Sequence, residues 1–119
     1  MLGLPLNVPM FLANEPTDLR KGVEGLSGIV RSQFSADPLD GSLFLFLNRR
    51  RDRLKILHFD GAGFWLYYRL LEAGTFEVIE SDAKCLKIDA AHLAMLLAGV
   101  PLKTAKRRKR YQRPKARER

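Results

Sequence analysis

A dense cluster of arginines is the strongest chemical signal in this 119-residue sequence. The run NRRRDR at 48–53 holds four arginines, and a lysine follows on the same side of the expected strand as the last of them. The basic residues of this stretch are Arg49, Arg50, Arg51, Arg53 and Lys55. Guanidinium groups match phosphate oxygens with paired hydrogen bonds and also stack on bases. The cluster therefore predicts a hairpin that contacts nucleic-acid phosphate; a solvated loop paired with Asp52 is the alternative.

A second basic segment lies at the end of the sequence. Residues 103–119 hold 10 Lys/Arg against one acidic residue, whereas residues 1–102 hold 11 against 12, so the tail supplies the net charge of +8. Its expected phosphate-binding residues are Lys106, Arg107, Arg108, Lys109, Arg110 and Arg113. Such a segment neutralises phosphates regardless of base sequence. We expect 103–119 to be a disordered tail that binds nucleic acid; a solubilising end or a site for an acidic protein is the alternative.

Two further groups of residues could serve binding. Arg20 and Lys21 stand at the start of a predicted helix, the unfavourable end for cations, so they indicate either a partner anion or ion pairs with Glu24. Four aromatic residues occupy one predicted strand: Phe64, Trp65, Tyr67 and Tyr68. They could stack on single-stranded bases, although core or dimer-interface roles are the more usual ones.

Catalytic and metal-binding patterns are weak. The candidate carboxylates for a two-metal site are Asp18, Asp37, Asp40, Asp52, Asp60 and Glu72. A helix start explains Asp18, a turn with a following glycine explains Asp40 and Asp60, and arginine neighbours explain Asp52, so a carboxylate site is not expected. One cysteine and two histidines in separate segments give no zinc spacing. No catalytic residue, metal or cofactor is expected, and we predict a non-enzyme. A small toxin-type ribonuclease that uses His58 with Glu72 or Arg69 is an alternative, and a protein-only scaffold is another.

The elements that position these residues predict one compact domain over 1–102. Short turns at 48–52, 60–63 and 72–74 separate apolar runs, which indicates strands at 42–47, 53–59, 64–71 and 75–79 in an antiparallel meander. Prolines around 8–13 favour a short edge strand there, and 85–88 is a further short strand. The expected fold is α+β, with a four- to five-stranded mainly antiparallel sheet.

Two helices complete the predicted domain. One long helix over 17–34 should begin at Thr17 and pack on the sheet. Glycines at every third position from Gly22 favour close packing on the sheet, and a backbone face pressed against a partner is the alternative. A short C-terminal helix at 90–98 should begin at Asp89 and end at Gly99. Strands 43–47 and 64–68 are apolar on both faces, which predicts burial on both sides. The long helix should cover one face, and the C-terminal helix or a second copy of the chain should cover the other.

Several of these segments resemble a known family. They are PTDLRKGVEGL at 16–26, DPLDGSLFLF at 37–46, the long block at 48–76 and HLAMLLAG at 92–99. Together they resemble, over residues 3–99, the small accessory proteins called TnpB of bacterial insertion sequences of family sixty-six, which are unrelated to the RNA-guided nucleases of that name. The chain departs from the family pattern at Phe59, Leu70 and His92.

The resemblance implies a role in DNA transposition beside a separate DDE-type transposase and a second small accessory protein. DNA is the expected ligand, and a second copy of the chain is a further candidate partner. The sequence shows neither a secretion signal nor a run of about 18 apolar residues, so membrane association is not expected and a cytoplasmic, nucleoid-associated location is.

Overall fold

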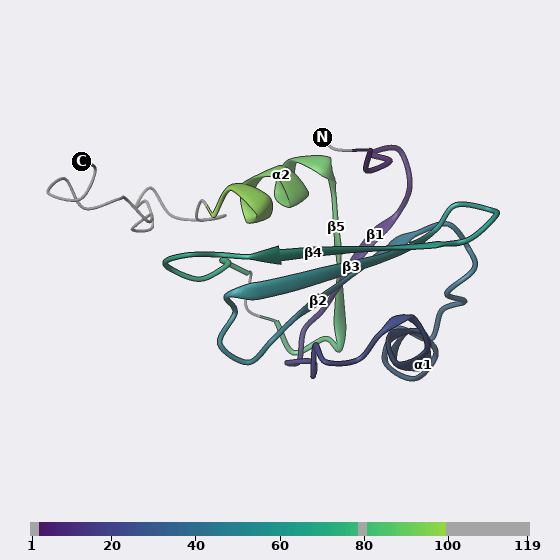
Figure 1. Cartoon of the computed structure of the whole chain (residues 1–119), viewed down its shortest axis with the longest axis horizontal. Coiled ribbons are helices and arrows are strands. Elements are labelled where there is room, and N and C mark those ends of the chain that lie inside the picture. The colour runs from purple at the N-terminus through teal and green to yellow at the C-terminus, as the bar shows by residue number, and fades with distance from the viewer. Residues whose placement is uncertain (1–2, 79–80, 100–119) are drawn as a thin grey trace, which may run out of the picture.

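The computed structural model of the chain describes residues 3–78 and 81–99 (Figure 1). In chain order the elements are β1 (Met10–Ala13), α1 (Val23–Gln33), β2 (Leu43–Leu47), β3 (Arg53–Phe59), β4 (Phe64–Leu70), β5 (Cys85–Ile88) and α2 (Ala90–Ala98). The fold is α+β, as the sequence predicts. The expected basic tail at 103–119 lies outside the described residues.

The five strands form one mixed sheet in the order β4-β3-β2-β1-β5. The predicted meander is present from β2 to β4, where both pairings are antiparallel. However, β1 pairs parallel with β2, from Met10 opposite Leu43 to Leu12 opposite Leu45, so the expected mainly antiparallel sheet was wrong. A parallel pair needs a long crossover, and the segment that carries α1 supplies it.

The first strand is an interior strand, not the edge strand that its prolines predict. It lies between β2 and β5, with Met10 opposite Ile88 and Ala13 opposite Cys85. Pro9 directly precedes the strand, and its carbonyl accepts a hydrogen bond from the Leu43 amide at 2.9 Å. A proline at the start of a strand removes no donor from the interior ladder, which is why the position tolerates it.

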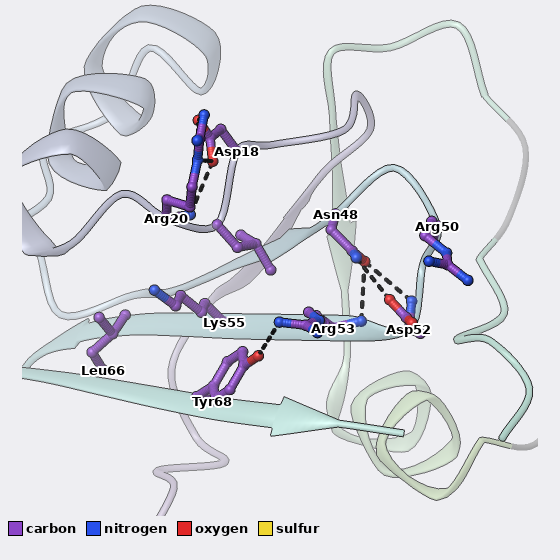
Figure 2. A pocket seen from close by; sticks show the side chains of 10 residues that line it. Asp18, Arg20, Asn48, Arg50, Asp52, Arg53, Lys55, Leu66 and Tyr68 are labelled. Atoms are coloured by element: carbon purple, nitrogen blue, oxygen red, sulfur yellow. Dashed lines mark hydrogen bonds and ion pairs between the residues drawn. The ribbon is translucent and has the colours of Figure 1, made fainter. Parts of the chain in front are cut away.

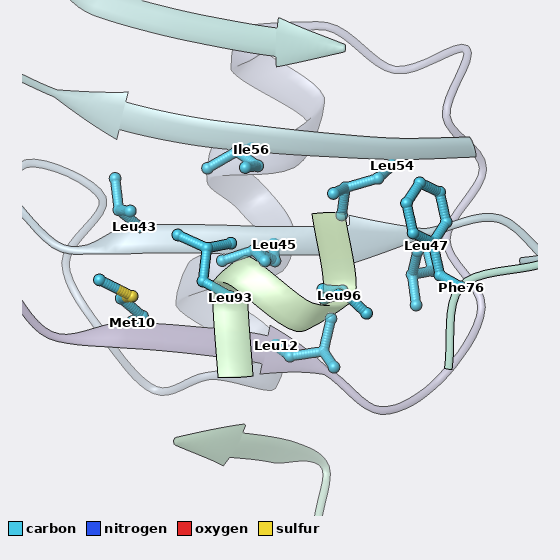
Figure 3. Packing of buried hydrophobic residues seen from close by; sticks show 10 residues of the cluster. All are labelled: Met10, Leu12, Leu43, Leu45, Leu47, Leu54, Ile56, Phe76, Leu93 and Leu96. Carbon is cyan, nitrogen blue, oxygen red and sulfur yellow. The ribbon is translucent and has the colours of Figure 1, made fainter. Parts of the chain in front are cut away.

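Each face of the sheet is covered by one helix (Figure 1). The central strand β2 is therefore buried at all five positions, as its apolar sequence predicts. On the α2 face, Leu93 and Leu96 of the helix pack on side chains from β1, β2 and β3 (Figure 3). On the α1 face, Leu26 and Val30 pack against Phe44 and Phe46 of β2.

The first helix is shorter than the predicted range 17–34. Residue 17 belongs to the sheet end, because the Thr17 amide donates to the Leu47 carbonyl at 2.8 Å and its hydroxyl oxygen is buried without a hydrogen bond. The helix begins after Gly22, whose extended backbone provides no side-chain cap. The glycines do not pack on the sheet as expected: a Cβ at Gly28 would meet nothing within 4 Å, and one at Gly25 would meet the Lys21 side chain.

The second helix begins and ends where the sequence predicts. The Asp89 carboxylate accepts from the His92 amide at 2.8 Å, and Gly99 takes the left-handed conformation, with φ 72°, that ends the helix. The short strand expected at 85–88 is also present as β5.

The strand predicted at 75–79 does not form over its described residues, 75–78. Instead, Phe76 inserts into the core of the α2 face, and its amide donates to the Arg51 carbonyl at 2.6 Å. This segment therefore stabilises the loop between β2 and β3 through a backbone hydrogen bond. Residue 79 lies outside the described part of the chain.

Candidate nucleic-acid interface

An open groove of about 680 Å³ lies on the α1 face, between the loop that precedes α1 and the hairpin of β2 and β3. Figure 2 shows that its lining comes from three segments far apart in the sequence. The lining residues are Asp18, Leu19, Arg20, Asn48, Arg50, Asp52, Arg53, Lys55, Leu66 and Tyr68. Four cations thus face two carboxylates. The fold brings the predicted basic residue at position 20 to the predicted basic hairpin.

The hairpin loop is held in shape by the Asn48 side chain. Its Oδ1 accepts from the amides of Asp52, at 3.1 Å, and Arg53, at 3.0 Å, while its Nδ2 donates to the Asp52 carboxylate at 2.7 Å (Figure 2). Because the loop is fixed internally, the guanidinium groups are presented by a rigid connection. The sequence analysis treated Asn48 as part of the loop and missed this role, although Asn is a common residue in such turns.

We expect Asn48→Ala to destabilise the folded chain by about 2 kcal/mol, since two backbone donors lose their acceptor in a half-buried loop. The shift in the free energy of urea unfolding measures this effect. Arg49→Ala, at an exposed neighbour on the same loop, is the matched control and should change stability by less than about 0.5 kcal/mol. Equal effects of the two substitutions would contradict the role given to Asn48.

The loop divides its arginines between two sides. Arg50 and Arg53 line the groove, whereas Arg51 faces a small recess on the other side, beside Asn14, Glu15 and Pro16. Arg51 adopts a positive φ of 59°, which turns the chain sharply at this point. Arg49 is exposed and lies outside the groove lining.

Tyr68 lies beside the basic residues of β3. The Arg53 guanidinium donates to the Tyr68 hydroxyl at 3.1 Å, and the Lys55 ammonium stands 5.7 Å from the centre of the same ring. Lys55 also donates to the Lys21 carbonyl at 3.1 Å, which joins the β3 residues to the loop before α1. The ring is half exposed, so it offers a flat aromatic surface next to two cations. The sequence analysis named Tyr68 as a candidate for stacking on bases. Its position beside Arg53 and Lys55 depends on the register of β3 with β4, which the sequence does not give.

Arg20 is already paired in the groove. Its guanidinium forms a two-pronged contact with the Asp18 carboxylate, with Nη2 2.9 Å from Oδ2 and Nε 3.0 Å from Oδ1. This hydrogen bonding lowers the pKa of Asp18 well below its usual range and raises the pKa of Arg20. The sequence predicted an ion pair with Glu24 as one possibility for Arg20, but the ion pair that forms is with Asp18. Both side chains are exposed, so an incoming phosphate can exchange with Asp18 at modest cost.

A separate polar cluster lies at the other end of the meander, around Asp60. Its carboxylate accepts from the amides of Ala62 and Gly63, at 2.9 and 3.0 Å, and from the indole of Trp65 at 2.8 Å. These hydrogen bonds, the Ala62 one first, lower the pKa of Asp60. Asp60 therefore contributes stability above its unfolded-state pKa, and that contribution is lost as the pH falls through the lower folded-state value.

Because Trp65 is the single tryptophan, its fluorescence should report the protonation of Asp60. We expect an acid transition in the emission of the folded chain with a midpoint below the ordinary Asp value of about 3.9. Asp60→Asn should abolish the transition. A midpoint at or above the ordinary value, while circular dichroism still shows a folded chain, would contradict the assigned hydrogen bonds.

The sheet register separates His58 from Arg69, one of its two candidate catalytic partners. His58 is buried, and its Nδ1 lies 3.5 Å from the Ser42 carbonyl. It stands opposite Trp65 in the sheet, whereas Arg69 stands opposite Leu54, four positions along β3. No group of three or more metal-ligating side chains is present within 3–78 and 81–99.

Five of the six carboxylates that were candidates for metal binding make local structural contacts. Asp37 and Asp40 accept from the amides two positions further on, at 2.9 and 2.8 Å. Asp18, Asp52 and Asp60 bond to Arg20, Asn48 and the turn before Trp65, as described above. The turn contacts of Asp40 and Asp60 are those that the glycine after each predicts. The Asn48 contact of Asp52 was not predicted, and Asp18 pairs with Arg20 instead of starting a helix.

The fold and the groove define a small α+β protein with a mixed five-stranded sheet and a basic surface groove. The chain belongs to the family of IS66 Orf2-like proteins, whose model matches residues 8–107. Family membership associates the chain with the transposition machinery of an insertion sequence.

Two relatives from Sinorhizobium fredii (strain NBRC 101917 / NGR234) are similar over most of their length. Uncharacterized protein y4jC is 33% identical over 114 residues, which cover 96% of this chain and 97% of the relative. Uncharacterized protein y4hO is 34% identical over 100 residues, which cover 84% and 87%. No solved structure matches the chain. Within the described residues, neither helix has the length and apolar character required to cross a bilayer.

Proposed function

We propose that this chain is a non-enzymatic accessory factor for DNA transposition that binds DNA through its basic groove and its basic tail. The observation that carries the proposal is the convergence of Arg20, Arg50, Arg53 and Lys55 on one open groove. Four cations against two carboxylates leave the groove with a net positive charge, even with Arg20 paired to Asp18.

The chemistry of the groove suits a DNA backbone better than a small anion. The groove is open to solvent, so a polymer can contact it without being enclosed. Guanidinium groups at several points of such a groove can each contact a different phosphate and release bound counterions. The half-exposed Tyr68 ring beside Arg53 and Lys55 adds a surface on which a base or sugar can rest.

The basic tail extends this contact in the proposal. Residues 103–119 carry ten of the 21 Lys/Arg, and a segment of this composition adds affinity that is independent of base sequence. In a cell, binding of this kind would keep the protein on the nucleoid. An apolar part of the folded domain then remains available to dock the DDE-type transposase or the second accessory protein of the element.

Fluorescence anisotropy with the full chain tests the DNA half of the proposal. The probes are a duplex that contains an end of the insertion sequence and an unrelated duplex of equal length, each titrated at several salt concentrations. We expect binding to both at low salt, with the logarithm of the association constant falling linearly against the logarithm of the salt concentration. Lack of binding to either duplex at low salt would reject it. Co-purification with the transposase and the second accessory protein, with and without end DNA, tests the docking half.

A further inference from the structure

The outer edge of the sheet at β4 is exposed and apolar. Among the described residues, β4 stands at the end of the strand order and pairs with β3 alone. Burial of both faces of 64–68 was expected from its sequence, yet Trp65 is 55% exposed, Tyr68 51% and Leu70 42%. Three of the five large hydrophobic residues that are exposed in the described chain thus lie on this one strand. The clustering sets this edge apart from the rest of the surface.

This edge also lacks the features that usually prevent strand pairing. Exposed edges are commonly shortened, bulged, or interrupted by proline or lysine. β4 is seven residues long, contains no proline or lysine, and carries Arg69 as its one charged residue. Its residues pair with β3 without interruption from Phe64 to Leu70. The outward backbone groups of such a strand are best satisfied by another strand.

We propose that a second copy of the chain covers this edge, with the two β4 strands antiparallel about a two-fold axis that passes through Tyr67 normal to the sheet. In this register Phe64 stands opposite the partner's Leu70, and Trp65 opposite the partner's Arg69. Leu66 stands opposite the partner's Tyr68. All seven residues of each strand are then paired, and the two sheets become one continuous sheet of ten strands.

The register follows from length and charge. A two-fold axis normal to the sheet pairs residues that lie on the same face, so the axis must pass through a residue pair. An axis at Leu66 or Tyr68 leaves two residues of each strand unpaired, and an axis at Arg69 places the two arginines directly opposite each other. The axis at Tyr67 avoids both and sets each guanidinium beside an indole ring, a favourable cation–π pair.

The α2 face provides a place for the indole ring of the second copy. A mostly apolar groove of about 430 Å³ lies between β4 and α2, lined by Tyr67 and Arg69 of the strand and by Ala94, Leu97 and Ala98 of the helix. The partner's Trp65, opposite Arg69, would lie at this groove. The orientation of the Trp65 side chain is fixed by two contacts: its indole donates to Asp60, and its ring stacks on Tyr67 with the ring centres 6.3 Å apart. β4 supplies both the projecting Trp65 ring and one wall of the groove that would receive the partner's Trp65. The surface of one copy is therefore complementary to the same surface of a second copy.

Oligomeric state measured by sedimentation velocity across a concentration series tests the proposal with the full chain. We expect a concentration-dependent dimer. Trp65→Lys should raise its dissociation constant by about tenfold or more, because lysine then faces the partner's Arg69 at two symmetric positions. Adding Arg69→Glu to Trp65→Lys should restore the dimer by replacing both repulsions with ion pairs. Leu39→Lys, at an equally exposed apolar residue away from β4, is the matched control and should leave the dimer intact.

Circular dichroism of each variant establishes that the fold persists. If Trp65→Lys unfolds the chain, Leu70→Lys provides the same test at the position opposite the partner's Phe64. A wild-type chain that stays monomeric at every concentration would overturn the proposal, as would occupation of this edge by the chain's own residues 100–119. A dimer that Trp65→Lys and Leu70→Lys leave unchanged would overturn it too. The pairing does not depend on DNA binding, so failure of either proposal leaves the other standing.

Discussion

The double substitution of Arg50 and Arg53 by alanine should weaken DNA binding by at least about tenfold at low salt. Both guanidinium groups line the groove, and each charge-assisted contact to phosphate is among the stronger hydrogen bonds in proteins. The slope of log affinity against log salt should also fall by about two, one for each lost phosphate contact. Anisotropy titrations of the full-length variant against a labelled duplex, at several salt concentrations, measure both quantities.

A matched control separates a site effect from a general loss of positive charge. The double substitution of Lys84 and Lys87 by alanine removes the same charge from exposed residues at the opposite edge of the sheet, at β5. At the point of the salt series near about 0.15 M, we expect it to change affinity by less than about threefold, because surface charges this far from the groove are screened at that ionic strength. If the two double variants lose affinity equally, the groove has no special role and the tail alone carries the binding.

Phe44→Ala should destabilise the folded chain by about 3–5 kcal/mol. Phe44 lies on the central strand with no exposed surface, and its ring contacts Phe34 edge-on at 5.3 Å and stacks near Phe11 at 6.0 Å. Truncation would leave a cavity between β2 and α1 that the fixed strands cannot close. Since small domains are stable by only about 5–15 kcal/mol, a substantial unfolded fraction is expected on mild heating.

Urea unfolding followed by far-ultraviolet circular dichroism measures this loss. Leu39→Ala, at an exposed leucine, is the control and should shift the free energy of unfolding by less than about 1 kcal/mol. A loss below about 1 kcal/mol for Phe44→Ala would contradict the packing of α1 on the sheet described above.

The local parts of the fold were predictable from the sequence. The strands at 43–47, 53–59 and 85–88 and the helix at 90–98 follow from apolar runs and from turn or capping residues within a few positions. Asp89 and Gly99 fix both ends of α2 through contacts of this local kind. Such signals depend on neighbouring residues only, so they can be recognised before the tertiary structure is known.

The errors arose where distant contacts decided the outcome. Threonine is a favourable residue at the start of a helix, but the Thr17 amide donates a hydrogen bond to the Leu47 carbonyl at the end of β2. The helix α1 therefore begins six residues later, at Val23. The prolines around β1 indicated an edge, yet pairing with β2 on one side and β5 on the other places the strand inside. The apolar pattern of β4 resembles that of β2, but only β2 has neighbours on both sides. Neither pairing partner nor strand order is encoded locally.

The candidate site divides in the same way. The spacing of Arg53 and Lys55 on one face of a strand was correct, because alternation is a local property. Arg20 and Tyr68 could not be assigned to the groove from the sequence. Their positions depend on the crossover through α1 and on the register of β3 with β4. The residues at 106–113 lie outside the described structure, and their role in DNA binding stays a prediction.

The position of β1 between β2 and β5 has a consequence for synthesis on the ribosome. Met10 emerges early, but its neighbour Ile88 is added only when nearly the whole folded part has been translated. Until then the nascent sheet ends at β1 on one side and at β4 on the other, and both strands present unsatisfied backbone groups. A ribosome that stalls after β4 therefore carries a product in which β1, an apolar strand of the interior of the finished sheet, is an open edge that can aggregate until β5 pairs with it.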